Sequence, residues 1–249
     1  MEYNIVLYLC FILNVNFGGF MKILAIRHVK EEGPGYLYNI FSERGFGIGT
    51  NVIDICDITT DSSSKINIEE YNFLIILGGY MGVYESDKYP FLKDEFKIVE
   101  KALGRNIPII GICLGSQVLA HVLGARVYKG KNGKEIGWYK IYKQHDHKFI
   151  HNFPREFNAF CWHGDTFDLP KDSLHIFSSE KYQNQGFIYK NSIGLQFHIE
   201  VDQNMILEWA NLYSDELKEE NIDKGSLIGK TEEIKKIQNY LTTLIDNML

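Results

Sequence analysis

The sequence predicts an α/β fold in three layers, built on a doubly wound, mostly parallel sheet. Two observations carry this prediction: short apolar runs rich in β-branched residues recur along the first half of the chain, and segments with helical periodicity lie between them. Strands that read as continuous apolar runs are typical of a parallel sheet buried on both faces. Alternation of such strands with helices is typical of the doubly wound arrangement.

The apolar runs that predict the parallel strands lie at residues 22–27, 51–56, 73–79 and 107–112. A helix is predicted at 89–104, with Pro90 near its start and Gly104 at its end. On it, Phe91, Phe96, Val99 and Leu103 fall roughly on one face. A second helix is predicted at 114–125, directly after the fourth strand.

The second half of the chain shows a different pattern, in which strand candidates follow one another without helices. They lie at residues 135–142, 157–162, 174–179, 185–190 and 192–200, where hairpins or a mixed edge of the sheet are expected. Two amphipathic helices are predicted from about residue 202. The second carries an apolar stripe that predicts core packing, formed by Ile234, Ile237, Leu241, Leu244, Ile245 and Met248. We see no repeat or linker, so residues 21–249 are expected to form one domain.

Composition limits the classes of function. The chain has 249 residues, of which 45% are hydrophobic and 23% charged, as in an ordinary globular protein. Its formal net charge is −6 and it has no long basic run, which argues against nucleic acid as a primary partner. The four cysteines, Cys10, Cys56, Cys113 and Cys161, are too widely spaced for a zinc ribbon or a disulfide framework. They favour a reducing cytoplasm.

The first twenty residues differ from the rest. The run IVLYLCFIL (5–13) is apolar but too short to span a bilayer, and Glu2 stands where a signal peptide would have basic residues. Our hypothesis is that translation starts at Met21 and that residues 1–20 are an upstream start or a disordered leader. A short membrane anchor is the alternative, and we expect no membrane partner.

A lone cysteine follows the strand predicted at 107–112. Gly111, Cys113 and Gly115 form a Gly-x-nucleophile-x-Gly pattern between a strand and a helix, which is typical of a nucleophile elbow. The helix after Cys113 would direct free N–H groups at the sulfur, where they favour a thiolate and can receive an oxyanion. The alternative is a small buried cysteine of the core.

A thiolate that performs acyl transfer needs a base, and the base needs an orienting group. In the strand predicted at 192–200, Gln196, His198 and Glu200 share one face because alternate residues do. Alone, this pattern is equally typical of a polar strand face. Combined with the cysteine elbow, it predicts a triad in which Glu200 orients His198.

A glycine pair ends the strand predicted at 73–79. Backbone N–H groups at Gly78-Gly79 are suited to an oxyanion hole, because glycine allows close approach. The alternative is a tight turn that requires glycine for its backbone conformation alone.

Together these segments resemble a class I, triad-type glutamine amidotransferase domain. The resemblance is carried by LGGYMGVYE (77–85), GICLGSQVLAHVLGARV (111–127), EIGW (135–138), WHGDTFDLP (162–170) and GLQFHIE (194–200). It spans about residues 22 to 200, in the order found in the family, and is nearest to its stand-alone, GMP-synthase-like members. It implies a flavodoxin-like sheet.

The resemblance also implies a role for each candidate residue. Cys113 would be the nucleophile, His198 the base and Glu200 its orienting carboxylate. The other implied residues are Gly79 and Leu114, whose amides would form the oxyanion hole, and Gln117, Gly78, His163 and Asp165, which would line the glutamine pocket. For His163 and Asp165, a structural role in a turn is an equal expectation.

The implied activity is hydrolysis of the side-chain amide of L-glutamine through a cysteine thioester, with no metal or organic cofactor. Tyr80 stands where GMP synthetase amidotransferases usually have proline, and the sequence contains no ATP-pyrophosphatase domain. The ammonia would therefore pass to a separate synthetase partner, or the chain would act alone. The alternatives are a γ-glutamyl peptide or amide hydrolase with the same triad and a non-catalytic binding scaffold. The oligomeric state is not predicted.

Three other patterns carry less weight. GSLIGKT (225–231) has three residues between its glycines where a phosphate loop has four, and we expect a helix start there. GFGIG (45–49) lacks the dinucleotide-binding spacing. HDHKFIH (145–151) is expected to be a solvated loop and not a metal site.

Overall fold

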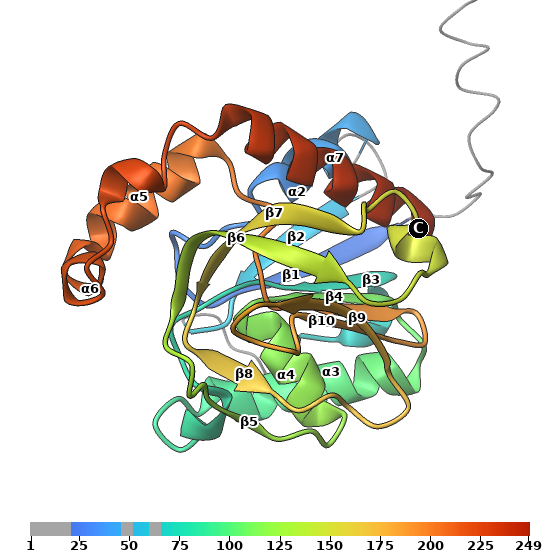
Figure 1. Ribbon diagram of the computed structural model, residues 1–249. Helices are drawn as coiled ribbons and strands as arrows, with labels where there is room; N and C mark the ends of the chain where they lie inside the picture. The colour runs from blue at the N-terminus through green and yellow to red at the C-terminus, as the bar shows by residue number, and fades with distance from the viewer. Residues whose placement is uncertain (1–20, 46–51, 60–65) are drawn as a thin grey trace, which may run out of the picture.

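The computed structural model describes residues 21–45, 52–59 and 66–249. The hypothesis on residues 1–20 and most of the GFGIG pattern lie outside these residues. Within the described residues, the main sheet has nine strands in the order β2-β1-β3-β4-β11-β10-β9-β6-β7 (Figure 1). Their bounds along the sheet are β2 Val52–Asp57, β1 Lys22–Arg27, β3 Phe73–Ile76, β4 Ile109–Ile112, β11 Ser192–Leu195, β10 Gly186–Tyr189, β9 Leu174–Ser179, β6 Glu135–Lys143 and β7 Glu156–His163.

The predicted fold class is confirmed. The five strands from β2 to β11 pair in parallel, and the remaining neighbours, from β11 to β7, pair antiparallel. The antiparallel part of the sheet therefore has as many strand pairs as the parallel part. The order β2-β1-β3-β4-β11 is that of a flavodoxin-like sheet, in which ligands bind beyond the carboxyl ends of the strands.

Helices cover both faces of the sheet (Figure 1). Their bounds are α2 Tyr36–Glu43, α3 Phe91–Gly104, α4 Leu114–Val122, α5 Gln203–Leu212, α6 Ser214–Glu219 and α7 Thr231–Met248. Side chains of β1 alternate between the two resulting cores: Ile23 and Ala25 join the one that includes α2 and α7, whereas Leu24 and Ile26 join the one that includes α3 and α4. Both faces of β1 are thus buried, as its continuous apolar run predicts.

The C-terminal prediction is right in its packing and incomplete in its elements. Every residue of the stripe from Ile234 to Met248 is buried, and α7 begins at the end of the GSLIGKT segment. Three helices, not two, follow residue 202, because the chain turns at Tyr213 between α5 and α6. Within the described residues, no helix combines the length and the apolarity needed to cross a bilayer.

One predicted strand is too long, and one small sheet was not predicted. The strand predicted at 192–200 ends at Leu195, and beyond it His198 makes only an isolated bridge to Phe160. The N–H of Gln196 still bonds Gln185, next to β10, but the N–H of His198 bonds Phe160 in β7, so the pairing of β11 with its neighbours does not continue. A small second sheet, β5 (Val127–Lys129) with β8 (Asp165–Phe167), was not predicted.

Candidate active site

Cys113 lies at a sharp turn between β4 and α4. Its φ of 51° is in the left-handed region, and its N–H bonds the carbonyl oxygen of Leu195 at 2.8 Å. A Cβ at Gly111 would overlap the carbonyl group of Gly115, and a Cβ at Gly115 would overlap that of Ile76. Both glycines of the predicted elbow are therefore required by close backbone approach, and the strained residue between them is the cysteine.

The structure brings His198 and Glu200 to Cys113. Nδ1 of His198 lies 2.6 Å from Oε1 of Glu200, and both side chains are buried. Burial alone lowers the pKa of His198, but the Glu200 carboxylate and a hydrogen bond with Cys113 outweigh it and raise this pKa well above its usual value. The His198 imidazole is thus held by the Glu200 carboxylate and hydrogen-bonded to Cys113.

The segment that carries His198 and Glu200 is held by three other elements. The N–H of His198 bonds the carbonyl oxygen of Phe160 in β7 at 2.7 Å, and the carbonyl oxygen of Glu200 accepts the N–H of Tyr36 at 2.7 Å. The indole of Trp209 in α5 packs edge-on against the His198 imidazole, with the ring centres 4.9 Å apart. These contacts replace the strand pairing that the sequence predicts, and they fix the imidazole.

The two residues whose amides are predicted to form the oxyanion hole, Gly79 and Leu114, lie close to each other. Leu114 is the first residue of α4, so its N–H has no acceptor within the helix. Among the backbone hydrogen bonds outside helices and strands in the described part of the chain, none comes from the N–H of Gly79. Gly79 and Cys113 line the same cavity, and a Cβ at Gly79 would come within 2.9 Å of the Leu114 side chain.

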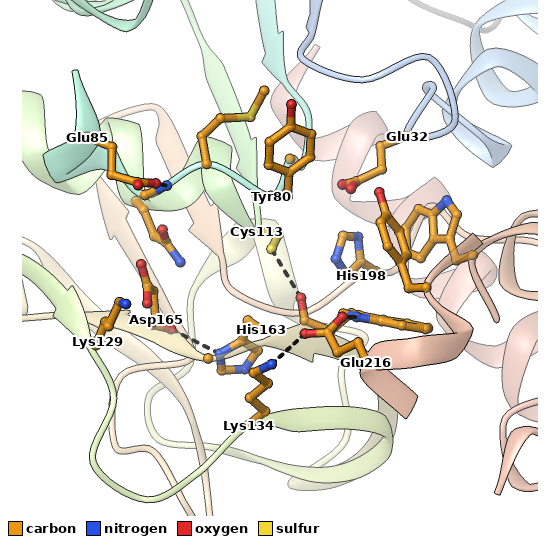
Figure 2. Close-up of a pocket in the computed structure, with 18 of the residues that line it drawn as sticks. Glu32, Tyr80, Glu85, Cys113, Lys129, Lys134, His163, Asp165, His198 and Glu216 are labelled. Atoms are coloured by element: carbon orange, nitrogen blue, oxygen red, sulfur yellow. Dashed lines mark hydrogen bonds and ion pairs between the residues drawn. The ribbon is translucent and has the colours of Figure 1, made fainter. Parts of the chain in front are cut away.

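Cys113 opens into a cavity of about 350 Å³ (Figure 2). Its wall includes many charged or phenolic side chains. They belong to Glu32, Tyr80, Tyr84, Glu85, Lys129, Lys134, Asp165, Tyr213 and Glu216. Gln117 and His163 also line it. Gln117 donates from Nε2 to Oε1 of Gln196 at 3.1 Å, and Nε2 of Gln196 lies 3.8 Å from the Cys113 sulfur.

The family model for glutamine amidotransferase class-I matches residues 33–205, which is more than half of the chain. The chain belongs to the class-I glutamine amidotransferase family. A crystal structure of a glutamine amidotransferase from Thermotoga maritima has a TM-score of 0.86 and 46% identity, over 92% of this chain and 98% of that one. The fold and the family that the sequence predicts are thus confirmed.

Two curated relatives of this amidotransferase are more distant. A glutamine amidotransferase-like protein of Acanthamoeba polyphaga mimivirus is 28% identical over 62% of this chain and 67% of its own length. A GMP synthase subunit from Methanocaldococcus jannaschii is 27% identical over 70% of this chain and 87% of its own length. The match spans only 23% and 34% of two full-length GMP synthases.

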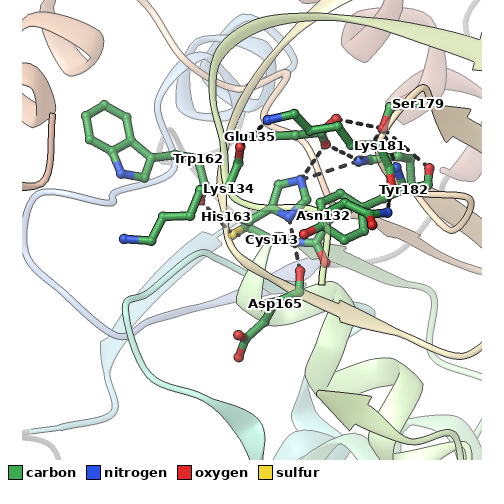
Figure 3. Close-up of polar contacts among 12 residues, drawn as sticks. Cys113, Asn132, Lys134, Glu135, Trp162, His163, Asp165, Ser179, Lys181 and Tyr182 are labelled. Carbon is green, nitrogen blue, oxygen red and sulfur yellow. Dashed lines mark hydrogen bonds and ion pairs between the residues drawn. The ribbon is translucent and has the colours of Figure 1, made fainter. Parts of the chain in front are cut away.

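His163 and Asp165 contribute to this amidotransferase cavity in different ways (Figure 3). Nε2 of His163 lies 3.0 Å from Oε2 of Glu135, and its Nδ1 lies 3.0 Å from the backbone oxygen of Asp165. Glu135 also accepts from Ser179 at 2.7 Å. The imidazole therefore holds the turn between β7 and β8. The Asp165 carboxylate lines the cavity, where burial and its hydrogen bond raise the pKa of Tyr84 above the usual value.

One group in the described residues has the donor atoms for a metal ion, namely Glu135, Cys161 and His163. The His163 imidazole and the Glu135 carboxylate are already hydrogen-bonded to each other. Burial raises the pKa of the Cys161 thiol well above its usual value, which disfavours the thiolate that a metal would need. Such a set does not fit a divalent cation without breaking its internal bonds. In the HDHKFIH segment, the rings of His145 and His151 bond backbone oxygens at 2.7 and 3.1 Å.

Sequence reasoning missed Glu32, which faces the cavity on the side of His198 (Figure 2). Burial raises the pKa of Glu32 to about 7, and the nearby His198 and His28 partly oppose this shift. A Cβ at Gly78 would overlap the Glu32 carboxylate and lie 3.2 Å from Cε1 of His198. A glutamate five residues after a strand gives no signal in the sequence, because only the fold brings it close to His198.

Proposed function

We propose that this chain hydrolyses the side-chain amide of L-glutamine, with Cys113 as nucleophile and His198 and Glu200 as its base and orienting carboxylate. The observation that carries this proposal is the position of the His198 imidazole between the Glu200 carboxylate and the strained Cys113. A carboxylate at Nδ1 fixes the tautomer and leaves Nε2 for the sulfur. Membership of the class-I family supports the same chemistry.

In the first half of the reaction, the Cys113 sulfur bonds to the δ-carbon of glutamine, and the carbonyl electrons move onto oxygen. The N–H groups of Gly79 and Leu114 would stabilise this oxyanion. Collapse breaks the C–N bond, and His198 gives its proton to the leaving ammonia. A γ-glutamyl thioester on Cys113 remains.

In the second half, His198 takes a proton from water, whose oxygen attacks the thioester carbon. Collapse of the second oxyanion releases glutamate and restores the Cys113 thiolate beside the imidazolium. Gln117, Gly78, His163 and Asp165 complete the proposed substrate contacts: Asp165 offers a carboxylate to the α-ammonium group, and His163 holds the turn that presents it. These steps use only the side chains and amides of the protein.

The destination of the ammonia is a further part of the proposal. The relative from Methanocaldococcus jannaschii is described as one subunit of GMP synthase, which supports a separate synthetase as partner of this chain. The negative net charge and the acidic cavity wall give no support to a nucleic-acid partner. Residues 21–249 are proposed to form the amidotransferase domain.

The test is ammonia release from L-glutamine by the wild type and by Cys113→Ala. We expect release by the wild type, none above background by the variant, and trapping of the thioester by hydroxylamine as γ-glutamyl hydroxamate. Turnover of γ-glutamyl dipeptides without turnover of glutamine would replace the proposal with a γ-glutamyl peptide hydrolase. Equal activity of Cys113→Ala would contradict both.

A further inference from the structure

Another buried histidine–glutamate pair lies next to the glycine loop, Gly78-Gly79. His28 follows β1 and Glu95 lies on α3, and both side chains are fully buried. Nε2 of His28 is 3.0 Å from each oxygen of the Glu95 carboxylate, and Nδ1 is 2.9 Å from the carbonyl oxygen of Gly78. A carbonyl oxygen can only accept a hydrogen bond, so Nδ1 carries a proton and donates it to Gly78.

This hydrogen bond fixes the direction of the N–H group of the next residue. The carbonyl of Gly78 and the N–H of Gly79 belong to one rigid peptide unit, and in a trans peptide they point in opposite directions. Holding the oxygen toward His28 therefore turns the Gly79 N–H away from His28. The unit lies beyond the last ladder bond of β3 with β1, from Leu77 N–H to Ile26 at 3.0 Å.

The peptide unit of Gly78 and Gly79 also packs closely against His28. A Cβ at Gly79 would come within 2.9 Å of both the His28 Cβ and the Leu114 side chain. The loop thus fills the space between the pair and the first turn of α4. A rotated peptide would leave the Gly78 oxygen without its donor in a buried setting, which is costly.

The charge on His28 strengthens the effect. Burial alone lowers the pKa of His28, but the Glu95 carboxylate and the bond to Gly78 outweigh it and raise this pKa above its usual value. A cationic donor makes a stronger hydrogen bond than a neutral one and polarises the peptide that accepts it. The N–H on the far side of that peptide becomes a better donor.

We propose that His28 and Glu95 are positioning residues for the oxyanion hole: His28 aims the Gly79 N–H at the reacting carbonyl oxygen, and Glu95 holds His28. This inference rests on the proposed function, because it assigns the pair to an oxyanion formed on Cys113. It predicts that the pair contributes to the turnover step and not to the reactivity of the thiolate.

The experiment compares His28→Leu, His28→Asn and Glu95→Gln with the wild type. His121→Leu is the matched control, since His121 is an exposed histidine near the end of α4. Two rates are measured: steady-state ammonia release from glutamine, and alkylation of Cys113 by iodoacetamide, followed by mass spectrometry. Alkylation is a displacement at carbon that forms no oxyanion, so it reports only on the thiolate.

We expect His28→Leu to lower kcat by about 30- to 300-fold, the order found when one oxyanion donor is lost, with KM and the alkylation rate within about threefold. His28→Asn retains an N–H donor and should recover kcat to within about tenfold of wild type. Glu95→Gln should lower kcat by about 3- to 10-fold, because it keeps an acceptor but removes the charge. His121→Leu should match the wild type in both rates.

Equal losses in turnover and alkylation would overturn the proposal, as would a His28→Leu enzyme with the kcat of the wild type. If His28→Leu does not fold, Glu95→Gln decides, and an unchanged kcat overturns the proposal. A wild type that hydrolyses γ-glutamyl dipeptides but not glutamine refutes only the proposed substrate, and the same variants are then compared on the dipeptide. A wild type that hydrolyses neither refutes both.

Discussion

The pairs His198–Glu200 and His28–Glu95 consist of the same residue types and lie beside the same glycine loop. Both are buried, with nitrogen–oxygen distances of 2.6 and 3.0 Å. In each, burial lowers the pKa of the imidazole, and the carboxylate together with the group at the other ring nitrogen more than offsets it. They differ in the second ring nitrogen, which faces the Cys113 sulfur in one pair and a backbone oxygen in the other. A histidine bonded to two fixed groups holds a backbone, whereas one that faces a thiol can move a proton.

The pair His163–Glu135 follows the second pattern. Its Nδ1 lies 3.0 Å from the backbone oxygen of Asp165, just as Nδ1 of His28 binds Gly78. Among the buried His–Glu pairs in the described ranges, only His198 therefore has a nitrogen directed at a nucleophile. The group at the second ring nitrogen, and not the composition of the pair, separates the proposed catalytic pair from the other two.

The largest expected effect follows from replacing His198, the histidine that we propose transfers protons. His198→Asn should lower kcat/KM for glutamine by about 10⁴-fold, the order seen when a triad member is removed. His28→Asn, the matched change in the other pair, should cost no more than about tenfold. Alkylation of Cys113 at pH 6 should slow in His198→Asn and not in His28→Asn, since only His198 supports the thiolate. Similar losses from both variants would erase the distinction between the pairs.

The second effect concerns stability. Glu95→Ala leaves the imidazole of His28 buried without its carboxylate, so we expect the free energy of unfolding to fall by about 3–5 kcal/mol at pH 6. Folding raises the pKa of His28 above 6.5, so the pair stabilises the protein below pH 6.5 and loses this contribution as pH rises through the folded value. In the variant, His28 can be buried neutral at high pH.

Urea unfolding at pH 6 and pH 9 measures this difference. The loss in Glu95→Ala should be smaller at pH 9, because a neutral imidazole costs less to bury. Glu100→Ala is the control on the exposed face of the same helix and should change stability by less than about 0.5 kcal/mol. A loss in Glu95→Ala that is the same at both values would show that the pair contributes by packing alone.

Local patterns account for most of what the sequence predicts about the fold. The strand at 73–76 and the helix α7 follow from the spacing of apolar residues along the chain. A fully buried strand shows a continuous apolar run, whereas a helix buried on one side shows apolar residues every three or four positions. The small sheet of β5 and β8 shows no such pattern, since three-residue strands are too short to show alternation. The strand predicted at 192–200 is too long for a different reason. Gln196 to Glu200 alternate in polarity as a strand does, but the N–H of His198 bonds β7, which is not a neighbour of β11.

The candidate site divides in the same way. Cys113, His198 and Glu200 lie in short motifs whose chemistry is visible along the chain. His28 and Glu95 are 67 positions apart and Glu32 lies in a loop, so nothing local connects them to the site. On α3, the sequence predicts that Phe91, Phe96, Val99 and Leu103 mark one face, whereas the buried face includes Glu95. Hydrophobic periodicity cannot identify Glu95 as a buried residue, because its partner His28 follows β1, far away in the sequence.

A third, smaller effect tests a carboxylate without a histidine bond of its own. Folding raises the pKa of Glu32 from 4.5 to about 7, so its neutral form is favoured and stability falls as pH rises through this range. Glu32→Gln removes this loss. Relative to wild type, the variant should gain about 2 kcal/mol at pH 8, where the buried wild-type carboxyl must ionise, and far less at pH 5, where that carboxyl is protonated in the folded protein. Urea unfolding of Glu32→Gln and of its neighbour Glu31→Gln measures the gain, and an equal gain at both pH values would contradict it.

The smallest effect is expected at the cavity rim, where the comparison reaches solvent. Nζ of Lys134 lies 2.7 Å from Glu216 and 3.4 Å from Glu220, with about a third of each side chain exposed. Screening limits such pairs, so Lys134→Met should cost less than about 1 kcal/mol and the cost should shrink in 0.5 M salt. We expect kcat within about twofold of wild type and a small rise in KM, since α6 borders the cavity through Glu216. A larger loss of stability that does not depend on salt would mean that the Lys134–Glu216 pair behaves like the buried pairs His198–Glu200 and His28–Glu95. Solvent exposure would then not distinguish the pairs.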